Sequence, residues 1–389
     1  MPIDGKIKIK VTVSSSVIKS IFITSSRPTH ITQLFTEQSI QKVATTIDAL
    51  YQLCNIAHRF AFLRLLDKCK VISLSKNEIM AYQLLLDLET IKEHCFSIAT
   101  KWCINDNQII NKNIIELLAT IKKINSSLFS SDNTLSLNKK TIQSFSIIKP
   151  LIEKLEQQLT IAIIGNEFDA KTIFDNSSNF KHWIETKNSD CAIFLHNIQK
   201  YQFGDMGNIN ANFLPNTVIK KLTNLLNNDN FISQPSYKDS CYETTPYARQ
   251  SNHPLIQQLF DKYGSGVFTR ASAQLLEIFE LLKRIKTNYT QIHNEDIYYK
   301  INTSANATAM VNIDAARGKL IHRLSIQGEK IKTYRILSPT QWNFHPQGVL
   351  KQMIKLIYFK DKQDLNDKIK LLVNAIDPCV GYVIEIDYA

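Results

Sequence analysis

Two cysteines near opposite ends of the chain are the residues best suited to bind a metal. Cys54 and His58 stand four residues apart in "ALYQLCNIAHRF", and a helical pattern would place both side chains on one face. Cys379 lies in "DPCVGY", where Pro378 and Gly381 indicate a tight turn that either presents a thiol or ends a domain. Two ligands are too few for a structural zinc site, so a buried cysteine beside a hydrogen-bonded histidine is the more frequent explanation of the first pair.

Three polar segments could supply further side chains to such a site. "NIDAARGKLIH" places Arg317 before a glycine at the start of an expected strand, where its guanidinium could donate to an anionic ligand. "LSPTQWNFHP" carries Thr340 in a polar, aromatic turn, and "CYETTPYARQ" sets Glu243 and Arg249 in a short loop. Each segment taken alone is as readily explained as ordinary surface or core structure, so none of them identifies a site.

The net charge of +11 does not by itself indicate a protein that binds nucleic acid. The lysines are dispersed among acidic residues, and the sequence has neither a zinc-finger spacing nor an RNA-binding motif. No apolar run approaches membrane-spanning length, and the start "MPIDGKIKIKVTV" lacks the apolar region of a signal peptide. The seven cysteines are irregularly spaced, which favours a reducing compartment. We therefore expect a cytoplasmic protein with no membrane span and no nucleic-acid partner.

Hydrophobic periodicity predicts an α+β fold in which helices dominate, in a single domain over residues 1–389. The short run "TIAIIG", residues 160–165, could be a buried strand. Residues 166–252 are rich in Asn and Ser, and we expect long loops there, interrupted by a helix near 217–226. The other expected segments are strands over 6–24, a helical core over 37–158 that begins with a helical pattern over 37–68, a helix over 272–292, a β hairpin over 319–337, and C-terminal helices with a cysteine turn over 347–389.

Taken together and in order, these segments resemble the large subunit of nickel–iron hydrogenases. "ALYQLCNIAH" is similar to that family's Arg-x-Cys-Gly-x-Cys-x-x-x-His motif, and "DPCVGYVIE" is similar to its closing Asp-Pro-Cys-x-x-Cys-x-x-His motif. "ETTPYAR", "AARGKLIH" and "PTQWN" resemble its Glu-x-Gly-Pro-x-Ala-Arg, Ala-Pro-Arg-Gly-x-x-x-His and Pro-Thr-Thr-Trp-Asn segments. Asp4 and Gly5 stand where the family has Glu-Gly near its start. The resemblance implies long core helices with small peripheral β-sheets.

Three departures from the family pattern concern the metal ligands. Tyr51 replaces the first cysteine of the N-terminal pair, Tyr382 replaces the second cysteine of the C-terminal pair, and Glu385 replaces the closing histidine. A nickel–iron centre of this family needs four thiolates, so we expect neither hydrogen turnover nor bound nickel. Because the chain ends at Ala389, soon after the last motif, we also expect no cleaved C-terminal extension.

The depleted cysteines are similar to those of the HupK/HoxV group of hydrogenase assembly proteins. That resemblance implies a maturation scaffold, not an enzyme, which transiently holds iron as an Fe(CN)2CO unit before its transfer. It implies that Cys54 and Cys379 ligate the iron. Arg317 and Thr340 would position the cyanides, and His58 would support the ligands from behind. The implied partners are a maturation chaperone, an iron–sulfur scaffold protein and the precursor of the hydrogenase large subunit.

Two alternatives stay open at the level of the sequence. A hydrogenase-like protein without metal could be a catalytically inactive structural or quinone-binding subunit, although the retained Cys54 and Cys379 argue against it. A degenerate hydrogen sensor would still need four thiolates. The distance between the two sulfurs separates these hypotheses, because sulfurs too far apart to share one metal would exclude an iron-holding scaffold.

Overall fold

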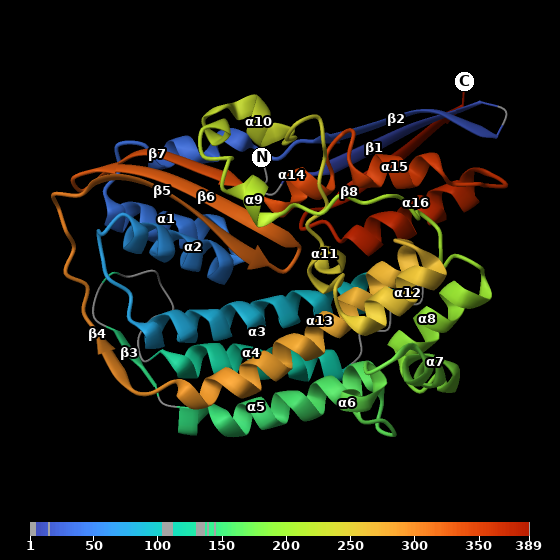
Figure 1. Cartoon of the computed structure of the whole chain (residues 1–389), viewed down its shortest axis with the longest axis horizontal. Coiled ribbons are helices and arrows are strands. Elements are labelled where there is room, and N and C mark those ends of the chain that lie inside the picture. The colour runs from blue at the N-terminus through green and yellow to red at the C-terminus, as the bar shows by residue number, and fades with distance from the viewer. Residues whose placement is uncertain are drawn as a thin grey trace.

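The computed structural model describes residues 5–14, 16–102, 112–129, 137, 140–143 and 145–388. Long helices run side by side through the lower part of Figure 1, and the two three-stranded sheets lie above them. This confirms the helix-dominated α+β fold with small peripheral sheets that the sequence predicts. Asp4 lies outside the described residues.

One long helix carries the acidic side chains that lie behind the candidate site. This helix, α3 (Lys76–Lys101), begins where the Ser75 hydroxyl accepts a hydrogen bond from the backbone N–H of Glu78 at 3.0 Å. It is buried along most of its length because α4 and α13 pack against it. The other long helices are α4 (Lys112–Leu128), α5 (Phe145–Leu159) and α13 (Val267–Asn288).

A three-stranded sheet joins the two ends of the described chain. Its strands are β1 (Ile7–Ser14), β2 (Val17–Ser25) and β8 (Tyr382–Tyr388), in the order β2-β1-β8. Alternate residues of β1 are fully buried, and the strand pairs in parallel with β8. The sequence predicts only helices and a cysteine turn over 347–389, so it misses β8. This pairing brings the end of β2 close to the turn that contains Cys379.

A second sheet is an antiparallel meander of β5 (Asn306–Ala315), β6 (Gly318–Gln327) and β7 (Lys330–Leu337). The structure has the hairpin expected over 319–337, and Gly328 takes a φ of 62° in its turn. The preceding strand β5 pairs with β6, which the sequence reading did not foresee. Helix α2 packs against β5 and β6, so this sheet supports the start of that helix.

The helical pattern over 37–68 forms two helices, α1 (Ile40–Leu50) and α2 (Asn55–Lys68). Tyr51 and Cys54 have φ values of −113° and −128°, so the backbone leaves the helical conformation between the two helices. Cys54 therefore precedes α2. The prediction that Cys54 and His58 share one helical face is wrong. The break presents the Cys54 side chain at the start of a helix.

The residues over 160–164 form a π-helical turn that continues α5, so the prediction of a buried strand is wrong. The prediction of long loops over 166–252 is also wrong in part, because several short helices lie there. These helices are α6 (Ala170–Ile173), α7 (Ser177–Thr186), α8 (Asp190–Lys200), α9 (Asn216–Ile219), α10 (Asp229–Ser233) and α11 (Pro246–Gln250). Three of the Asn and Ser residues cap helices with their side chains: Asn176, Ser189 and Asn228 accept hydrogen bonds from backbone N–H groups of the first turns of α7, α8 and α10.

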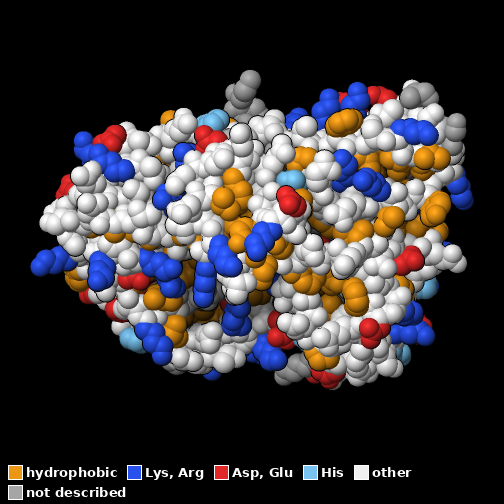
Figure 2. Space-filling view, turned by 45° about the horizontal axis from the view of Figure 1, so that its top comes forward, with side chains coloured by type: hydrophobic (Ala, Val, Ile, Leu, Met, Phe, Trp, Pro, Cys, Tyr) orange, Lys and Arg blue, Asp and Glu red, His pale blue; other side chains and the backbone are white. Residues whose placement is uncertain are grey.

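Four further α-helices and a short strand pair belong to the described fold, together with the 3-10 helices Thr29–Phe35, Leu225–Asn227 and Tyr289–Gln291. The α-helices and strands are α12 (Pro254–Tyr263), α14 (Pro339–Asn343), α15 (Val349–Lys355), α16 (Lys362–Ile376), β3 (Lys140–Ile142) and β4 (Glu295–Ile297). None of the described helices has the length and apolar character needed to cross a membrane. On the face shown in Figure 2, Lys and Arg side chains are spread widely, with acidic and hydrophobic side chains among them.

Candidate functional site

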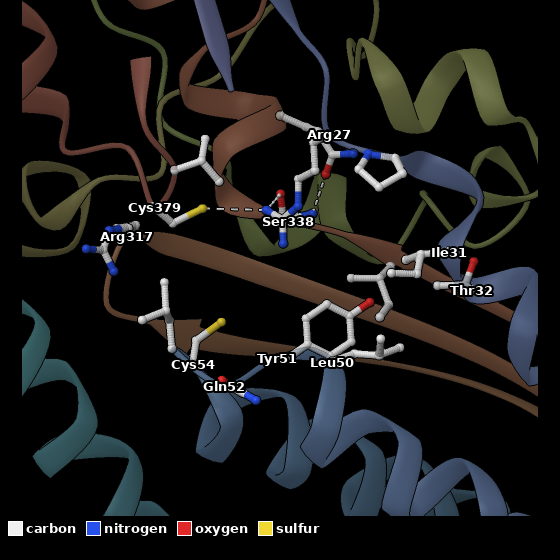
Figure 3. A pocket seen from close by; sticks show the side chains of 15 residues that line it. Arg27, Ile31, Thr32, Leu50, Tyr51, Gln52, Cys54, Arg317, Ser338 and Cys379 are labelled. Atoms are coloured by element: carbon white, nitrogen blue, oxygen red, sulfur yellow. Dashed lines mark hydrogen bonds between the residues drawn. The ribbon is translucent and has the colours of Figure 1, made fainter. Parts of the chain in front are cut away.

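Cys54 and Cys379 line the same small pocket, whose volume is about 60 Å³. Figure 3 shows them on opposite walls, with Cys54 on the turn before α2 and Cys379 on the turn after α16. Further walls come from the segment after β2, the turn between β5 and β6, and the residues that follow β7. The structure thus brings both predicted iron ligands into one cavity, as the resemblance implies.

Cys54 faces the pocket because another side chain caps its helix. Glu89 of α3 accepts hydrogen bonds from the backbone N–H groups of Ile56 and Ala57, at 2.9 and 3.0 Å. The thiol of Cys54 makes no capping bond. Burial and the nearby carboxylate of Glu89 raise the pKa of the Cys54 thiol well above its usual value, while Arg27 and Arg317 oppose that shift. At neutral pH the metal-free thiol is therefore protonated, and a metal that binds it must displace a proton.

Cys379 is held in its turn by contacts from two other parts of the chain. Its Sγ lies 2.9 Å from the hydroxyl oxygen of Thr340 and 3.5 Å from Nη1 of Arg27. The turn itself is fixed by Asp377, which has a φ of 59° and accepts a hydrogen bond from the Ser97 hydroxyl at 2.9 Å. The sulfur is thus contacted by a hydroxyl group and a guanidinium group, both of which can donate to a thiolate.

Arg317 lines the pocket, but carboxylates engage much of its guanidinium group. Nη1 donates to Glu93 at 2.8 Å, and Nε lies 3.4 Å from Asp377. Burial alone would lower the pKa of Arg317, but Asp377 and Glu93 hold it above its usual value, so the charge is permanent. Among the described residues, Nε of Arg317 is buried and has no hydrogen-bond partner, although a carboxylate oxygen of Asp377 lies close to it. Asn343 fixes the backbone by donating to the carbonyl oxygen of Arg317 at 2.8 Å.

Thr340 and His58 are not among the described residues that line the pocket. The hydroxyl of Thr340, on α14, contacts the Cys379 sulfur instead. His58 is buried behind Tyr51, whose ring stacks on the imidazole with centroids 3.7 Å apart. Both residues therefore act on pocket-lining side chains in this structure, and the direct contact of Thr340 with a cyanide stays a prediction.

A buried chain of hydrogen bonds holds the edge of the His58 imidazole, whose face is covered by Tyr51. Its Nδ1 lies 3.0 Å from Nε2 of His322, whose Nδ1 lies 2.9 Å from the hydroxyl of Tyr334. Burial lowers the pKa of His58 well below its usual value, and the nearby His322 and Arg27 oppose its protonation further. Burial lowers the pKa of His322 to about 3. Both imidazoles are therefore neutral at neutral pH, and the chain orients Tyr51 as a rigid wall of the pocket.

Sequence reasoning missed Arg27 and Ser338. Arg27 follows β2 in "SSRPTH", and its Nη1 donates to the Ser338 hydroxyl at 3.1 Å (dashed lines in Figure 3). No local pattern singles out this arginine, because its position depends on the pairing of β1 with β8. Ser338 lies within "LSPTQWNFHP", directly before Pro339, but no local pattern distinguishes its hydroxyl as part of a site.

The donor set of the pocket suits a metal that brings ligands of its own. Within the described ranges, no group of three or more His, Cys, Asp and Glu side chains has an arrangement that could hold a metal ion. Two thiols alone do not complete a tetrahedral or octahedral coordination sphere. The surrounding guanidinium, hydroxyl and amide groups of Arg27, Ser338 and Gln341 are hydrogen-bond donors for metal-bound ligands.

Comparisons of sequence and of structure both find similarity to hydrogenases or to hydrogenase formation proteins. The family model described as nickel-dependent hydrogenase matches residues 265–381. The hydrogenase expression/formation protein HoxV of Cupriavidus necator is 42% identical over 76 residues, which is 18% of this chain and 20% of the relative. The hydrogenase expression/formation protein HupK of Bradyrhizobium diazoefficiens is 27% identical over 145 residues, 37% of this chain and 38% of the relative. The matched part thus spans well under half the length of either relative.

The structural matches cover nearly the whole chain. The reduced Ni-Fe-Se hydrogenase from Desulfovibrio vulgaris Hildenborough matches with a TM-score of 0.66 and 12% identity, over 94% of each chain. The reduced Ni-Fe-Se hydrogenase from Desulfomicrobium baculatum matches with a TM-score of 0.65 and 12% identity, over 95% of each chain. At this identity the matches establish the fold alone. The chain has the fold of nickel–iron hydrogenase large subunits, and its sequence relatives are hydrogenase expression/formation proteins of the HoxV and HupK type.

Proposed function

We propose that this protein is a hydrogenase maturation scaffold that holds an Fe(CN)2CO unit before the unit is transferred to the hydrogenase large subunit. The observation that carries the proposal is the single pocket shared by Cys54 and Cys379, which come from opposite ends of the chain. The names of the sequence relatives support a role in hydrogenase formation. The protein then acts as a carrier and not as an enzyme.

The pocket suits such a cargo in chemistry and in size. The thiolates of Cys54 and Cys379 would take two positions on the iron, and the diatomic ligands would fill others. Arg27 and Arg317 would donate to the nitrogen atoms of the cyanides through charge-assisted hydrogen bonds. A cavity of about 60 Å³ has room for a few small ligands. It is too small for a quinone, since pockets for molecules of that size measure roughly 300–1,000 Å³.

The proposed partners follow from the transient nature of the cargo. A carrier must receive the iron unit from one protein and deliver it to another. We assign the first role to the maturation chaperone with its iron–sulfur scaffold, and the second to the large-subunit precursor. We also propose that the protein works in the cytoplasm, because its irregularly spaced cysteines favour a reducing compartment.

The proposal can be tested by purifying the chain anaerobically together with the maturation proteins. Infrared spectroscopy should show cyanide and carbonyl bands, and elemental analysis should show bound iron. Cys54→Ala or Cys379→Ala should abolish both signals. Cys241→Ala is the matched control, because Cys241 is also partly buried but does not line the pocket. Full iron occupancy in the Cys379→Ala variant would contradict the proposal, as would absence of the bands under conditions that load the hydrogenase.

A further inference from the structure

The charged side chains among the described residues that line the pocket are all positive. Two arginines, Arg27 and Arg317, line the cavity, and none of the described lining residues is aspartate or glutamate. Glu93 and Asp377 lie behind Arg317 and contact its guanidinium at 2.8 and 3.4 Å. The charged side chains that line the cavity with the two sulfurs are therefore guanidinium groups, while Glu93 and Asp377 lie outside the lining.

Arg27 is the guanidinium that contacts a proposed iron ligand directly. Its Nη1 lies 3.5 Å from Sγ of Cys379 and 3.1 Å from the Ser338 hydroxyl (Figure 3). A guanidinium group has five N–H donors in one plane, so a group in this position can contact the sulfur and a neighbouring metal-bound ligand together. Arg27 would therefore be able to donate to a small ligand of a metal held by Cys379, in addition to its contact with the sulfur.

The backbone that carries Arg27 is held in place by the start of β1. Ser26 donates its N–H to the carbonyl oxygen of Lys6 at 2.9 Å, and the N–H of Lys6 donates to the Ser26 hydroxyl at 2.8 Å. Gly5 has a φ of 64°, and a Cβ added there would lie 2.6 Å from both Cα and N of Arg27. This close approach fixes the direction from which the Arg27 side chain enters the pocket.

We propose that Arg27 makes the pocket selective for iron that already carries anionic ligands, and against the bare ferrous ion. This inference rests on the proposed function. A ferrous ion is a dication, and guanidinium groups near the sulfurs repel it. Two cyanides cancel the charge of the ferrous ion, and two thiolates then make the bound complex dianionic, which guanidinium groups stabilise. The reaction that adds the cyanides must then occur before the iron reaches this pocket.

Two probes distinguish this selectivity from a structural role of Arg27. The full chain is titrated anaerobically with ferrous ion alone and, separately, with a synthetic iron(II) complex that carries two cyanides and carbonyl ligands. The variants are Arg27→Lys, Arg27→Met and Arg27→Glu. The matched control is Arg323→Met, which removes a guanidinium group of β6 that does not line the pocket. Circular dichroism establishes that each variant is folded.

The parent chain should bind the cyanide complex in preference to the ferrous ion. Arg27→Met should weaken binding of the complex by roughly tenfold or more, the loss expected for one charge-assisted hydrogen bond, without weakening binding of the ferrous ion. Arg27→Glu should reverse the preference, Arg27→Lys should keep it while shifting the cyanide stretching bands, and the control should behave as the parent.

Two different results would overturn these ideas, and they can be told apart. If the parent binds the complex and Arg27→Met binds both probes as the parent does, or loses both equally, then Arg27 is not the selectivity residue, although the scaffold function stands. If the parent fails to bind the complex while its fold is intact, the proposed function fails, and the inference about Arg27 fails with it.

Discussion

Replacing His322 by glutamine should change how the stability of the protein depends on pH. Burial lowers the pKa of this imidazole to about 3 from the ordinary value of 6.5. Below pH 6.5 the unfolded chain therefore binds a proton that the folded chain does not bind. The stability contribution of the neutral histidine is full above pH 6.5 and is lost progressively as the pH falls towards 3. For one group with these two pKa values, the loss between pH 7 and pH 5 is about 2 kcal/mol.

Glu89 acts in the opposite direction over the same range of pH. Burial raises the pKa of its carboxyl group to about 7 from 4.5, although the N–H groups of Ile56 and Ala57 and the charge of Lys92 oppose the shift. The folded chain then holds a proton that the unfolded chain has already lost, so acidification from pH 7 to pH 5 stabilises the fold by about 2 kcal/mol. The two effects nearly cancel in the parent, and only a comparison with the variant isolates the histidine.

Urea unfolding of both chains at pH 7 and at pH 5 provides that comparison. The His322→Gln variant should be less stable than the parent at pH 7, because it disturbs the hydrogen bonds with His58 and Tyr334. Its deficit should shrink by about 2 kcal/mol at pH 5, where the parent no longer benefits from a neutral histidine. His30→Gln, which removes a largely exposed imidazole, is the control. An equal deficit at both pH values would refute the inference that His322 is buried in its neutral form.

Three further predictions concern residues around the pocket. Thr340→Val should lower iron retention roughly threefold to tenfold, because its hydroxyl contacts the Cys379 sulfur at 2.9 Å; unchanged iron content after gel filtration would contradict this. Gly318→Ala should destabilise the chain by about 2 kcal/mol or more, because its φ is 135° and a Cβ would lie 2.2 Å from Thr244 Oγ1; an unchanged thermal midpoint would exclude that strain. Burial alone would raise the pKa of Asp377, but Arg317 and Lys101 hold it below 3.8, so its stabilising effect is present above that pH and is lost below it. Asp377→Asn should therefore cost about 3 kcal/mol in urea unfolding at pH 7 and less at pH 3, and a cost independent of pH would argue against the ion pairs.

The sequence alone predicted the site where residues able to bind a metal lie within recognisable local motifs. Cys54 and Cys379 could be assigned to one site because their motifs occur in the order that a known fold requires. The break before α2 could not be foreseen, because apolar residues continue at helical spacing across Tyr51 and only the capping carboxylate of Glu89 shows where α2 begins. Glu89 comes from another helix, so no local reading of the sequence includes it.

Arg27 illustrates a second limit of the sequence. Its importance depends on β8, a strand formed by "YVIEIDY". This strand pairs in parallel with β1, although the whole helical core separates the two strands along the sequence. Contacts between segments so far apart in the chain leave no periodic signal in either of them. The partly wrong expectation of loops over 166–252 has a local cause instead, since Asn and Ser are frequent both in loops and at the first positions of helices.

The two tyrosines that replace cysteines bear on how the proposed cargo is released. Tyr382 does not line the pocket, and its hydroxyl donates to Asn374 at 2.9 Å. Tyr51 does line the pocket, and its ring is fixed against His58. A tyrosine at position 51 leaves the pocket one possible thiolate short, and fewer protein–metal bonds would then have to break when the iron unit leaves. Restoring a thiolate with Tyr51→Cys should therefore increase iron retention and slow its transfer to the hydrogenase precursor, whereas Tyr51→Phe should leave both unchanged. Transfer can be followed as the rate at which cyanide bands appear in the precursor, and a rate as fast in Tyr51→Cys as in the parent would show that the number of thiolates does not control release.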